Sequence, residues 1–190
     1  MSHRDTSRHH QSLPAARTRS AQALAITALM TAIAVPVAWG AAALVTDAPL
    51  SDLQPTTASA FDGASAKVTL VTRPKATTTV LRVHGVDPVV AGRTFGAHLH
   101  EGSCLAGNGG LAGGHYNHTK VLGQPVVVSA ATEIWLDVTV DADGDATSVS
   151  HVPFTVVPGQ RSVVIHALPT DPGTGLAGER LACLPVVWTS

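Results

Sequence analysis

Stretches in which polar and apolar residues alternate dominate the chain after residue 64. Such a period of two places every apolar side chain on one face of an extended strand. Turn residues separate the stretches, including an Asp-Gly pair at Asp143 and Gly144 that is typical of a hairpin. No segment after residue 46 shows the 3.6-residue periodicity of an amphipathic helix. The expected strands occupy residues 67–73, 77–84, 93–100, 125–129, 133–140, 146–151, 154–157, 161–166 and 181–188.

This pattern predicts an all-β fold. Short antiparallel strands joined by turns at these intervals favour a Greek-key β-sandwich or flattened barrel of about eight strands. The chain carries 12 Lys and Arg against 13 Asp and Glu, a formal net charge of −1. That balance gives no reason to expect a nucleic-acid partner.

An uncharged apolar run from Ala21 to Val45 precedes the strands; it follows four arginines and has small residues near its end, at 40–43. A basic segment, an apolar stretch and small residues form, in that order, a secretory signal peptide. The run is also long enough to cross a bilayer as an uncleaved anchor, although Pro36 and the small residues favour cleavage. Residues 1–43 are therefore expected to be a signal peptide or signal anchor. The protein would then be extracytoplasmic: secreted, periplasmic or in the cell envelope, or membrane-anchored through this segment alone.

Residues 44–63 contain two prolines, many small polar residues and little hydrophobic periodicity. That composition is typical of a flexible spacer. The folded domain is accordingly expected to span residues 64–190.

Four histidines in three separate segments suggest a metal site. His98 and His100 lie two residues apart at the end of an expected strand, so both imidazoles project from one face. His115 follows a glycine pair, where the backbone can pass close to an ion, and His166 ends an apolar strand. A nitrogen-only ligand set of this kind suits zinc or copper, and a tetragonal set suits Cu(II).

Four motifs in this order resemble the copper/zinc superoxide dismutases. They are GAHLHEGSC at 96–104, GGHYN at 113–117, VVIHA at 163–167 and GLAGERLAC at 175–183. The 15-residue step from His100 to His115 agrees as well, and the resemblance covers roughly Lys67 to the C-terminus. It implies a copper cofactor and superoxide as the substrate.

The resemblance also implies residue roles. His98, His100, His115 and His166 correspond to the copper ligands, and His115 to the histidine that bridges copper and zinc. Arg180 corresponds to the arginine that attracts superoxide beside the copper. Cys104 and Cys183 correspond to the intramolecular disulfide, and the two cysteines of an exported chain are in any case expected to pair.

Two departures from the family pattern resemble its copper-only members. Residues 117–150 hold a single histidine, His118, which lies too close to His115 for the family's zinc-ligand spacing. The connection between residues 166 and 180 is also shorter than the charged loop of the ordinary enzymes. Zinc is therefore expected to be absent.

In the copper-only members a glutamate orients the bridging-type histidine. Glu133 is the first candidate to accept the second ring N–H of His115, and Asp137 is a weaker one. The alternative interpretation of Glu133 is an exposed strand residue.

The expected function is that of a superoxide dismutase, a copper-dependent oxidoreductase with Arg180, His115 and Glu133 as its catalytic residues. A non-catalytic copper-binding or copper-delivery module of the same fold is the first alternative. A structural cell-surface domain is the second. Arg180 favours the enzyme over the first, and the four histidines argue against the second.

Overall fold

A computed structural model describes residues 42–188. Nearly all of the expected signal or anchor segment, 1–43, lies outside the described residues and stays a prediction. Among the residues described, no helix has the length and apolar character needed to span a membrane.

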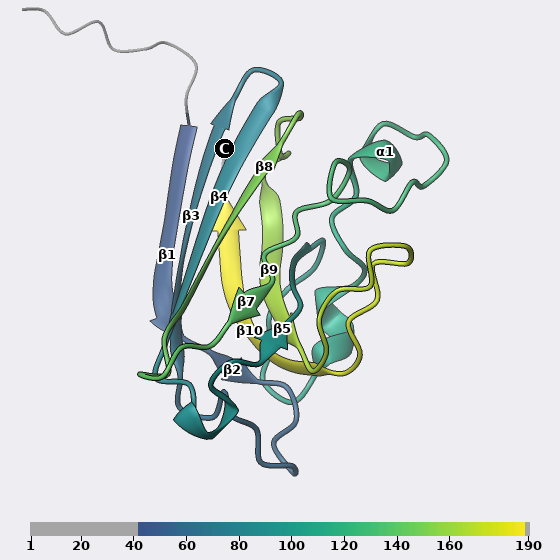
Figure 1. The fold of residues 1–190 in the computed structure, drawn as a ribbon. Helices are drawn as coiled ribbons and strands as arrows, with labels where there is room; N and C mark the ends of the chain where they lie inside the picture. The colour runs from purple at the N-terminus through teal and green to yellow at the C-terminus, as the bar shows by residue number, and fades with distance from the viewer. Residues whose placement is uncertain (1–41, 189–190) are drawn as a thin grey trace, which may run out of the picture. The chain divides into compact units, whose positions relative to one another are not determined.

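The regular secondary structure of the described chain is almost entirely antiparallel strand, which confirms the all-β prediction (Figure 1). The strands are β1 (Ala42–Pro49), β2 (Ser51–Asp52), β3 (Ser65–Arg73), β4 (Ala76–His84), β5 (Thr94–Phe95), β6 (Ala97–His100), β7 (Val138–Thr139), β8 (Ala146–Val152), β9 (Gly159–His166) and β10 (Arg180–Trp188). The helical segments are η1 (Pro88–Val90), η2 (Gly109–Ala112) and α1 (His118–Val121), each a single turn.

Two four-stranded sheets hold the core. One has the order β1-β3-β4-β8 and the other β2-β10-β9-β6, while β5 and β7 form a small separate pair. Burial alternates residue by residue along β3 and β4, as the sequence pattern predicts. Their buried apolar residues belong to the same cluster as Ile165 of β9 and Leu184 of β10. In the described region the sheets form a sandwich and do not close into a barrel.

The expectation of a flexible spacer at 44–63 is wrong. Residues 42–49 form β1, which pairs with β3 from Ala42 opposite Thr72 to Pro49 opposite Ser65. Without β1, the edge of β3 would present a row of unpaired backbone groups. Leu53 and Phe61, farther along, are buried at 6% and 2% exposure. The folded region therefore includes residues well before 64.

Two other expected strands, 125–129 and 154–157, are irregular segments, and their backbone groups bond to side chains. The carbonyl oxygen of Val127 accepts from the side chains of Asn117 and Thr132. The carbonyl oxygen of Phe154 accepts from the hydroxyl of Thr77. Local side-chain bonds of this kind compete with a strand ladder for the same groups.

The expected strand at 133–140 is assigned only at β7, yet the chain before β7 still runs antiparallel to β6. Leu99 N–H donates to the carbonyl of Ile134, and Leu136 N–H donates to that of Ala97. Ile134 and Leu136 are fully buried. Side chains at 133, 135 and 137 consequently point the other way, toward the outer side of β6.

Candidate metal centre

Four imidazoles converge beside the outer edge strand β6. One nitrogen from each of His98, His100, His115 and His166 lies within 4.8 Å of the others. His98 and His100 come from β6, and His166 is the last residue of β9. His115 lies in the loop after η2 and forms an isolated antiparallel bridge with His100. The structure thus brings together the four histidines that the sequence singles out.

Three of the four rings are oriented by acceptors that bind Nδ1. The Nδ1 atoms of His100 and His166 lie 3.1 Å and 3.2 Å from the carbonyl oxygens of Gly113 and Gly178. Nδ1 of His115 lies 2.8 Å from Glu133 Oε2. A carbonyl or a carboxylate can only accept, so each Nδ1 carries the proton and each Nε2 has a free lone pair.

His98 has the opposite orientation. Its Nε2 lies 2.7 Å from Thr170 Oγ1, while its Nδ1 is buried and has no hydrogen-bond partner. Nearby, Nε2 of His100 lies 3.3 Å from Nε2 of His166, so that two lone pairs face each other. A buried, unpartnered nitrogen beside facing lone pairs fits a cation bound by one Nδ1 and three Nε2 atoms.

Burial keeps these ligands neutral. Loss of hydration, with smaller contributions from the neighbouring imidazoles, lowers the pKa of His98 from its ordinary value of 6.5 to about 2. Burial is also the main cause that lowers the pKa of His100 to about 3 and that of His166 to about 4. At neutral pH the three rings therefore offer lone pairs to a metal and not protons.

Glu133 lies behind His115, where it accepts three hydrogen bonds. Its Oε2 accepts from His115 Nδ1 and from Trp135 Nε1 at 2.9 Å, and its Oε1 accepts from Asn117 Nδ2 at 2.9 Å. Burial alone would raise the pKa of Glu133, but these bonds outweigh it and the pKa is lowered. Glu133 is only 3% exposed, so the alternative of an exposed strand residue is wrong.

Asp137 makes a different contact from the one expected of it. Its carboxylate accepts from the backbone N–H and the hydroxyl of Thr170 and makes no hydrogen bond with His115. It faces the His98 side of the site because it lies four residues after Glu133 on the same face of an extended segment.

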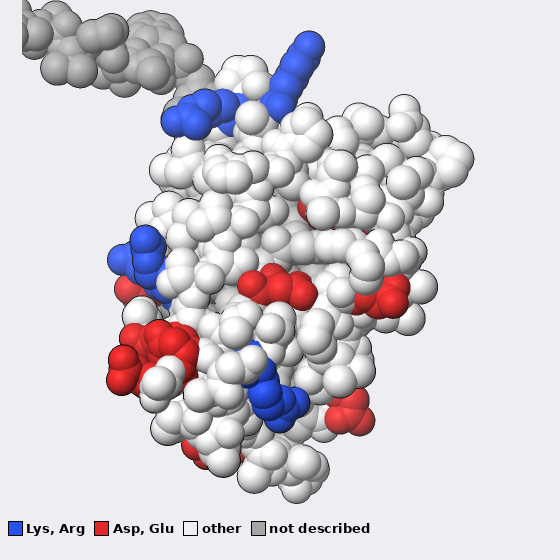
Figure 2. All heavy atoms as spheres, in the orientation of Figure 1, with Lys and Arg blue, Asp and Glu red and all other residues white. Residues whose placement is uncertain are grey.

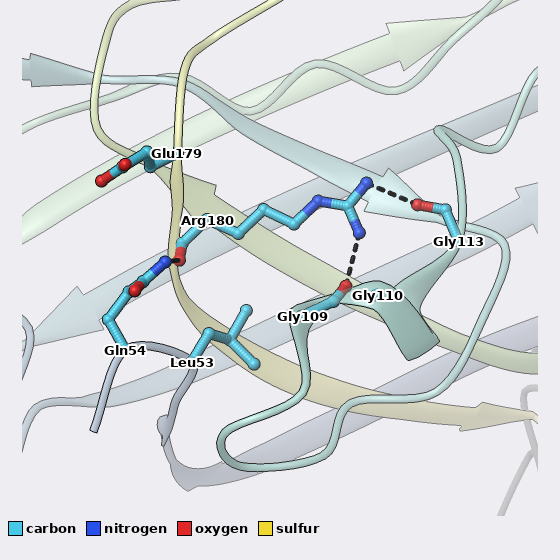
Figure 3. A pocket seen from close by; sticks show the side chains of 7 residues that line it. All are labelled: Leu53, Gln54, Gly109, Gly110, Gly113, Glu179 and Arg180. Atoms are coloured by element: carbon cyan, nitrogen blue, oxygen red, sulfur yellow. Dashed lines mark hydrogen bonds between the residues drawn. The ribbon is translucent and has the colours of Figure 1, made fainter. Parts of the chain in front are cut away.

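Arg180, the first residue of β10, is held by two backbone carbonyl groups (Figure 3). Its guanidinium donates to the carbonyl oxygens of Gly109 and Gly113, the latter at 2.6 Å. The Gly113 oxygen also accepts from His100 Nδ1, so the arginine and a ligand imidazole share one acceptor. Burial lowers the pKa of Arg180, yet a guanidinium stays charged at any physiological pH.

Two cavities meet at Arg180. One of about 460 Å³ lies between β10 and η2, and its lining includes Leu53 and Gln54. The other, about 420 Å³, is lined by His115, Glu133, Lys120 and Arg180 among others. Figure 2 shows few basic side chains on the face it draws, in keeping with a chain that is only 13% charged.

A disulfide joins Cys104 to Cys183, with their Cα atoms 5.7 Å apart. It ties the loop that carries Gly109 and Gly113 to β10, which carries Arg180. Cys183 is fully buried in a small apolar cluster with Leu53.

His118, the single histidine of 117–150, is not part of the four-histidine group. Its ring stacks on Phe154 with centroids 4.4 Å apart.

Sequence reasoning missed three residues that support the ligands: Asn117, Trp135 and Thr170. The alternation from 133 to 138 could have indicated Trp135, because it shares a face with Glu133. Nothing in the sequence indicates that Thr170 meets His98.

The family model of copper/zinc superoxide dismutase (SODC) matches residues 64–185. No curated protein matches the chain. The family match begins at the start of β3 and includes all four histidines, Arg180 and both cysteines.

Proposed function

The chain belongs to the copper/zinc superoxide dismutase family, and from this premise we propose that it disproportionates superoxide at a copper ion held by its four histidines. The reaction is 2 O2•− + 2 H+ → O2 + H2O2. Bound copper supplies the one-electron redox chemistry. The ligand atoms would be Nδ1 of His98 and Nε2 of His100, His115 and His166.

The observation that carries this proposal is the bond pattern at the carbonyl oxygen of Gly113, which joins Arg180 to His100. It fixes a permanent positive charge next to the ligand cluster. A site that merely stored copper would have no need of such a charge, whereas an enzyme with an anionic substrate would gain from it in rate and in binding. Arg180 would draw superoxide into the cavity that His115 and Glu133 line.

His115 is suited to handle the protons of the reaction. Its side chain is 18% exposed, whereas the other three ligands are nearly or fully buried. Glu133 holds the proton on Nδ1 and would stabilise the ring when Nε2 also takes a proton. Nε2 could then pass that proton to the reduced substrate.

We also propose that zinc is absent. Support comes from the second ring nitrogen of His115, which would bind zinc in a bridging role but here bonds to Glu133. His118 is not among the four converging histidines, and its ring stacks on Phe154, which also supports this proposal.

An extracytoplasmic location is part of the proposal. The Cys104–Cys183 disulfide supports it, because such bonds persist in oxidising compartments. The apolar run before β1 supports export by a signal peptide or an anchor.

The test is to load the protein with copper and zinc, measure both metals, and assay superoxide removal for the unaltered chain, Arg180→Ala and Arg73→Ala. A single copper without zinc and rapid superoxide removal are expected. Arg180→Ala should keep its copper and lose activity, while Arg73→Ala, which alters an exposed arginine at the end of β3, should lose neither. Copper binding without activity would favour the copper-binding module, and stoichiometric zinc would refute the copper-only proposal.

A further inference from the structure

Thr170 lies in the connection between β9 and β10 and makes two bonds to one carboxylate. Its backbone N–H donates to Asp137 Oδ2 at 2.9 Å, and its hydroxyl donates to Asp137 Oδ1. Neither carboxylate oxygen can return a proton while Asp137 is ionised. The single hydroxyl proton of Thr170 is therefore directed at Asp137.

The same hydroxyl oxygen lies 2.7 Å from Nε2 of His98. Because its proton is already given to Asp137, the oxygen can only accept in this contact, and His98 must carry its proton on Nε2. The lone pair is left on Nδ1, which is fully buried and has no other partner. The other three ligand histidines have the reverse arrangement, with Nδ1 bonded to an acceptor.

We propose that Thr170 is a positioning residue: its hydroxyl, oriented by Asp137, holds His98 as an Nδ1 ligand and joins the 167–179 connection to the copper site. This role rests on the proposed function, because it presupposes that a metal binds the four histidines. It concerns the metal geometry and does not depend on which substrate reacts there.

The surroundings of Thr170 fix its place. Leu168 O accepts from the N–H of Gly96 at 2.7 Å, and Asp171 Oδ1 accepts from the N–H groups of Gly173 and Thr174. A Cβ added at Gly96 would lie 2.9 Å from Thr170 Oγ1 and 2.5 Å from another side chain. Because Gly96, next to β6, has no side chain, it leaves the space through which the Thr170 hydroxyl reaches His98.

One short segment of the chain, which carries Glu133 and Asp137, orients two of the ligand histidines. Glu133 and Asp137 share a face of the chain next to β6, while Ile134 and Leu136 are buried on the opposite face. Glu133 orients His115 directly, and Asp137 orients His98 through Thr170. Two carboxylates four residues apart therefore set opposite ring orientations in two ligands.

The Thr170 hydroxyl has a role that can be tested separately from the bond by which the backbone N–H of Thr170 anchors the loop. The backbone N–H of Thr170 would still bond to Asp137 if the hydroxyl were removed. What would be lost is the acceptor for His98 Nε2–H, so the ring could exchange between its two neutral forms. Partners of this kind beyond the metal ligands are worth about 10–100-fold in metal affinity or activity.

The experiment compares Thr170→Val, which keeps the shape of the side chain, with Thr170→Ser, which keeps the hydroxyl. Thr77→Val is the matched control, because Thr77 is a buried threonine whose hydroxyl also makes two hydrogen bonds, neither of them to a ligand histidine. The measurements are copper affinity, the Cu(II) electron paramagnetic resonance spectrum and the melting temperature.

Thr170→Val is expected to weaken copper binding about 10–100-fold and to change the copper hyperfine splitting. Thr170→Ser should restore both, and Thr77→Val should lower only the melting temperature. An unchanged affinity and spectrum in Thr170→Val would overturn the role of Thr170 alone. If the unaltered chain bound no copper, the proposed function would fail and the role with it.

A second measurement covers the case in which Thr170→Val does not fold. Nitrogen-15 spectra of the metal-free, unaltered protein report which ring nitrogen of each histidine is protonated. Protonation of His98 at Nε2, opposite to His100 and His166, is expected. A proton on Nδ1 of His98 would refute the proposal.

Discussion

Oε2 of Glu133 lies 2.8 Å from Nδ1 of His115, and the same oxygen accepts from Trp135. The carboxylate is nearly buried, and its charge is balanced by donors and not by a cation in direct contact. It therefore fixes the ring orientation of His115, the most exposed of the four ligands. In a site without zinc, this is the interaction that would control His115.

Replacing Glu133 by Gln is expected to reduce copper affinity or activity about 10–100-fold. The amide keeps the size of the side chain but turns one acceptor oxygen into a donor, so one of the groups bonded to it must lose its acceptor. An unsatisfied buried group also costs about 1–3 kcal/mol of stability. Copper affinity, superoxide-removal kinetics and chemical denaturation measure these effects.

Asp47→Asn is the control for Glu133→Gln, since Asp47 forms an exposed ion pair with Lys67 on the β1–β3 edge. It removes a carboxylate of the same charge and should change neither copper binding nor activity. Full activity in Glu133→Gln would show that His115 does not depend on this carboxylate.

Arg180 is expected to act through its charge. Arg180→Ala should lower the second-order rate constant for superoxide by about 10-fold or more at low salt, and the rate should depend less on ionic strength. Arg180→Lys should recover part of the rate, because it restores the charge without the two fixed bonds to Gly109 and Gly113. Rates measured across a range of salt concentrations test this, and an unaltered salt dependence in Arg180→Ala would contradict it.

Much of the fold and of the ligand set was predictable from the sequence. Alternation in β3 and β4 depends on side-chain period alone, which is a local property. The histidines of β6 share a face for the same reason. Local context also singled out His115, after a glycine pair, and His166, at the end of an apolar strand. Their convergence with the β6 histidines was supported by motif resemblance, since no local rule brings three segments together.

The errors have a common physical cause, which is that backbone pairing depends on distant partners. Residues 44–49 look like part of a spacer until the free edge of β3 is available to them. Residues 154–157 look like a strand, but the side chain of Thr77 takes their backbone groups. The contact of Thr170 with His98 depends on the path of a connection that the sequence pattern does not determine.

The metal-free protein is expected to lose stability as the pH falls below about 6.5. Burial lowers the pKa of His98, His100 and His166 to about 2, about 3 and about 4 in the folded state, while the unfolded chain titrates near 6.5. In this interval the unfolded state binds more protons, so acid favours unfolding. The slope could approach about 4 kcal/mol per pH unit if all three contribute fully.

Denaturant titrations of the metal-free protein between neutral pH and about pH 4 measure this slope. Copper should move the acid transition to lower pH, because binding requires neutral imidazoles. His100→Gln, which leaves one fewer titrating ring, should flatten the curve. A stability that does not change with pH in this interval would show that the rings are not buried as described.

The disulfide is expected to affect both stability and activity. Cys104 and Cys183 are 79 residues apart in sequence, and closing a loop of this length stabilises the folded state by about 4–5 kcal/mol on the chain-entropy model. The bond also holds the Gly109–Gly113 region against β10, so reducing it should loosen the two carbonyl contacts of Arg180. The double variant Cys104→Ser, Cys183→Ser should therefore unfold at lower denaturant and, while folded, show a weaker salt dependence of its rate. A stable double variant that kept the full salt dependence would mean that the disulfide does not contribute to positioning the arginine.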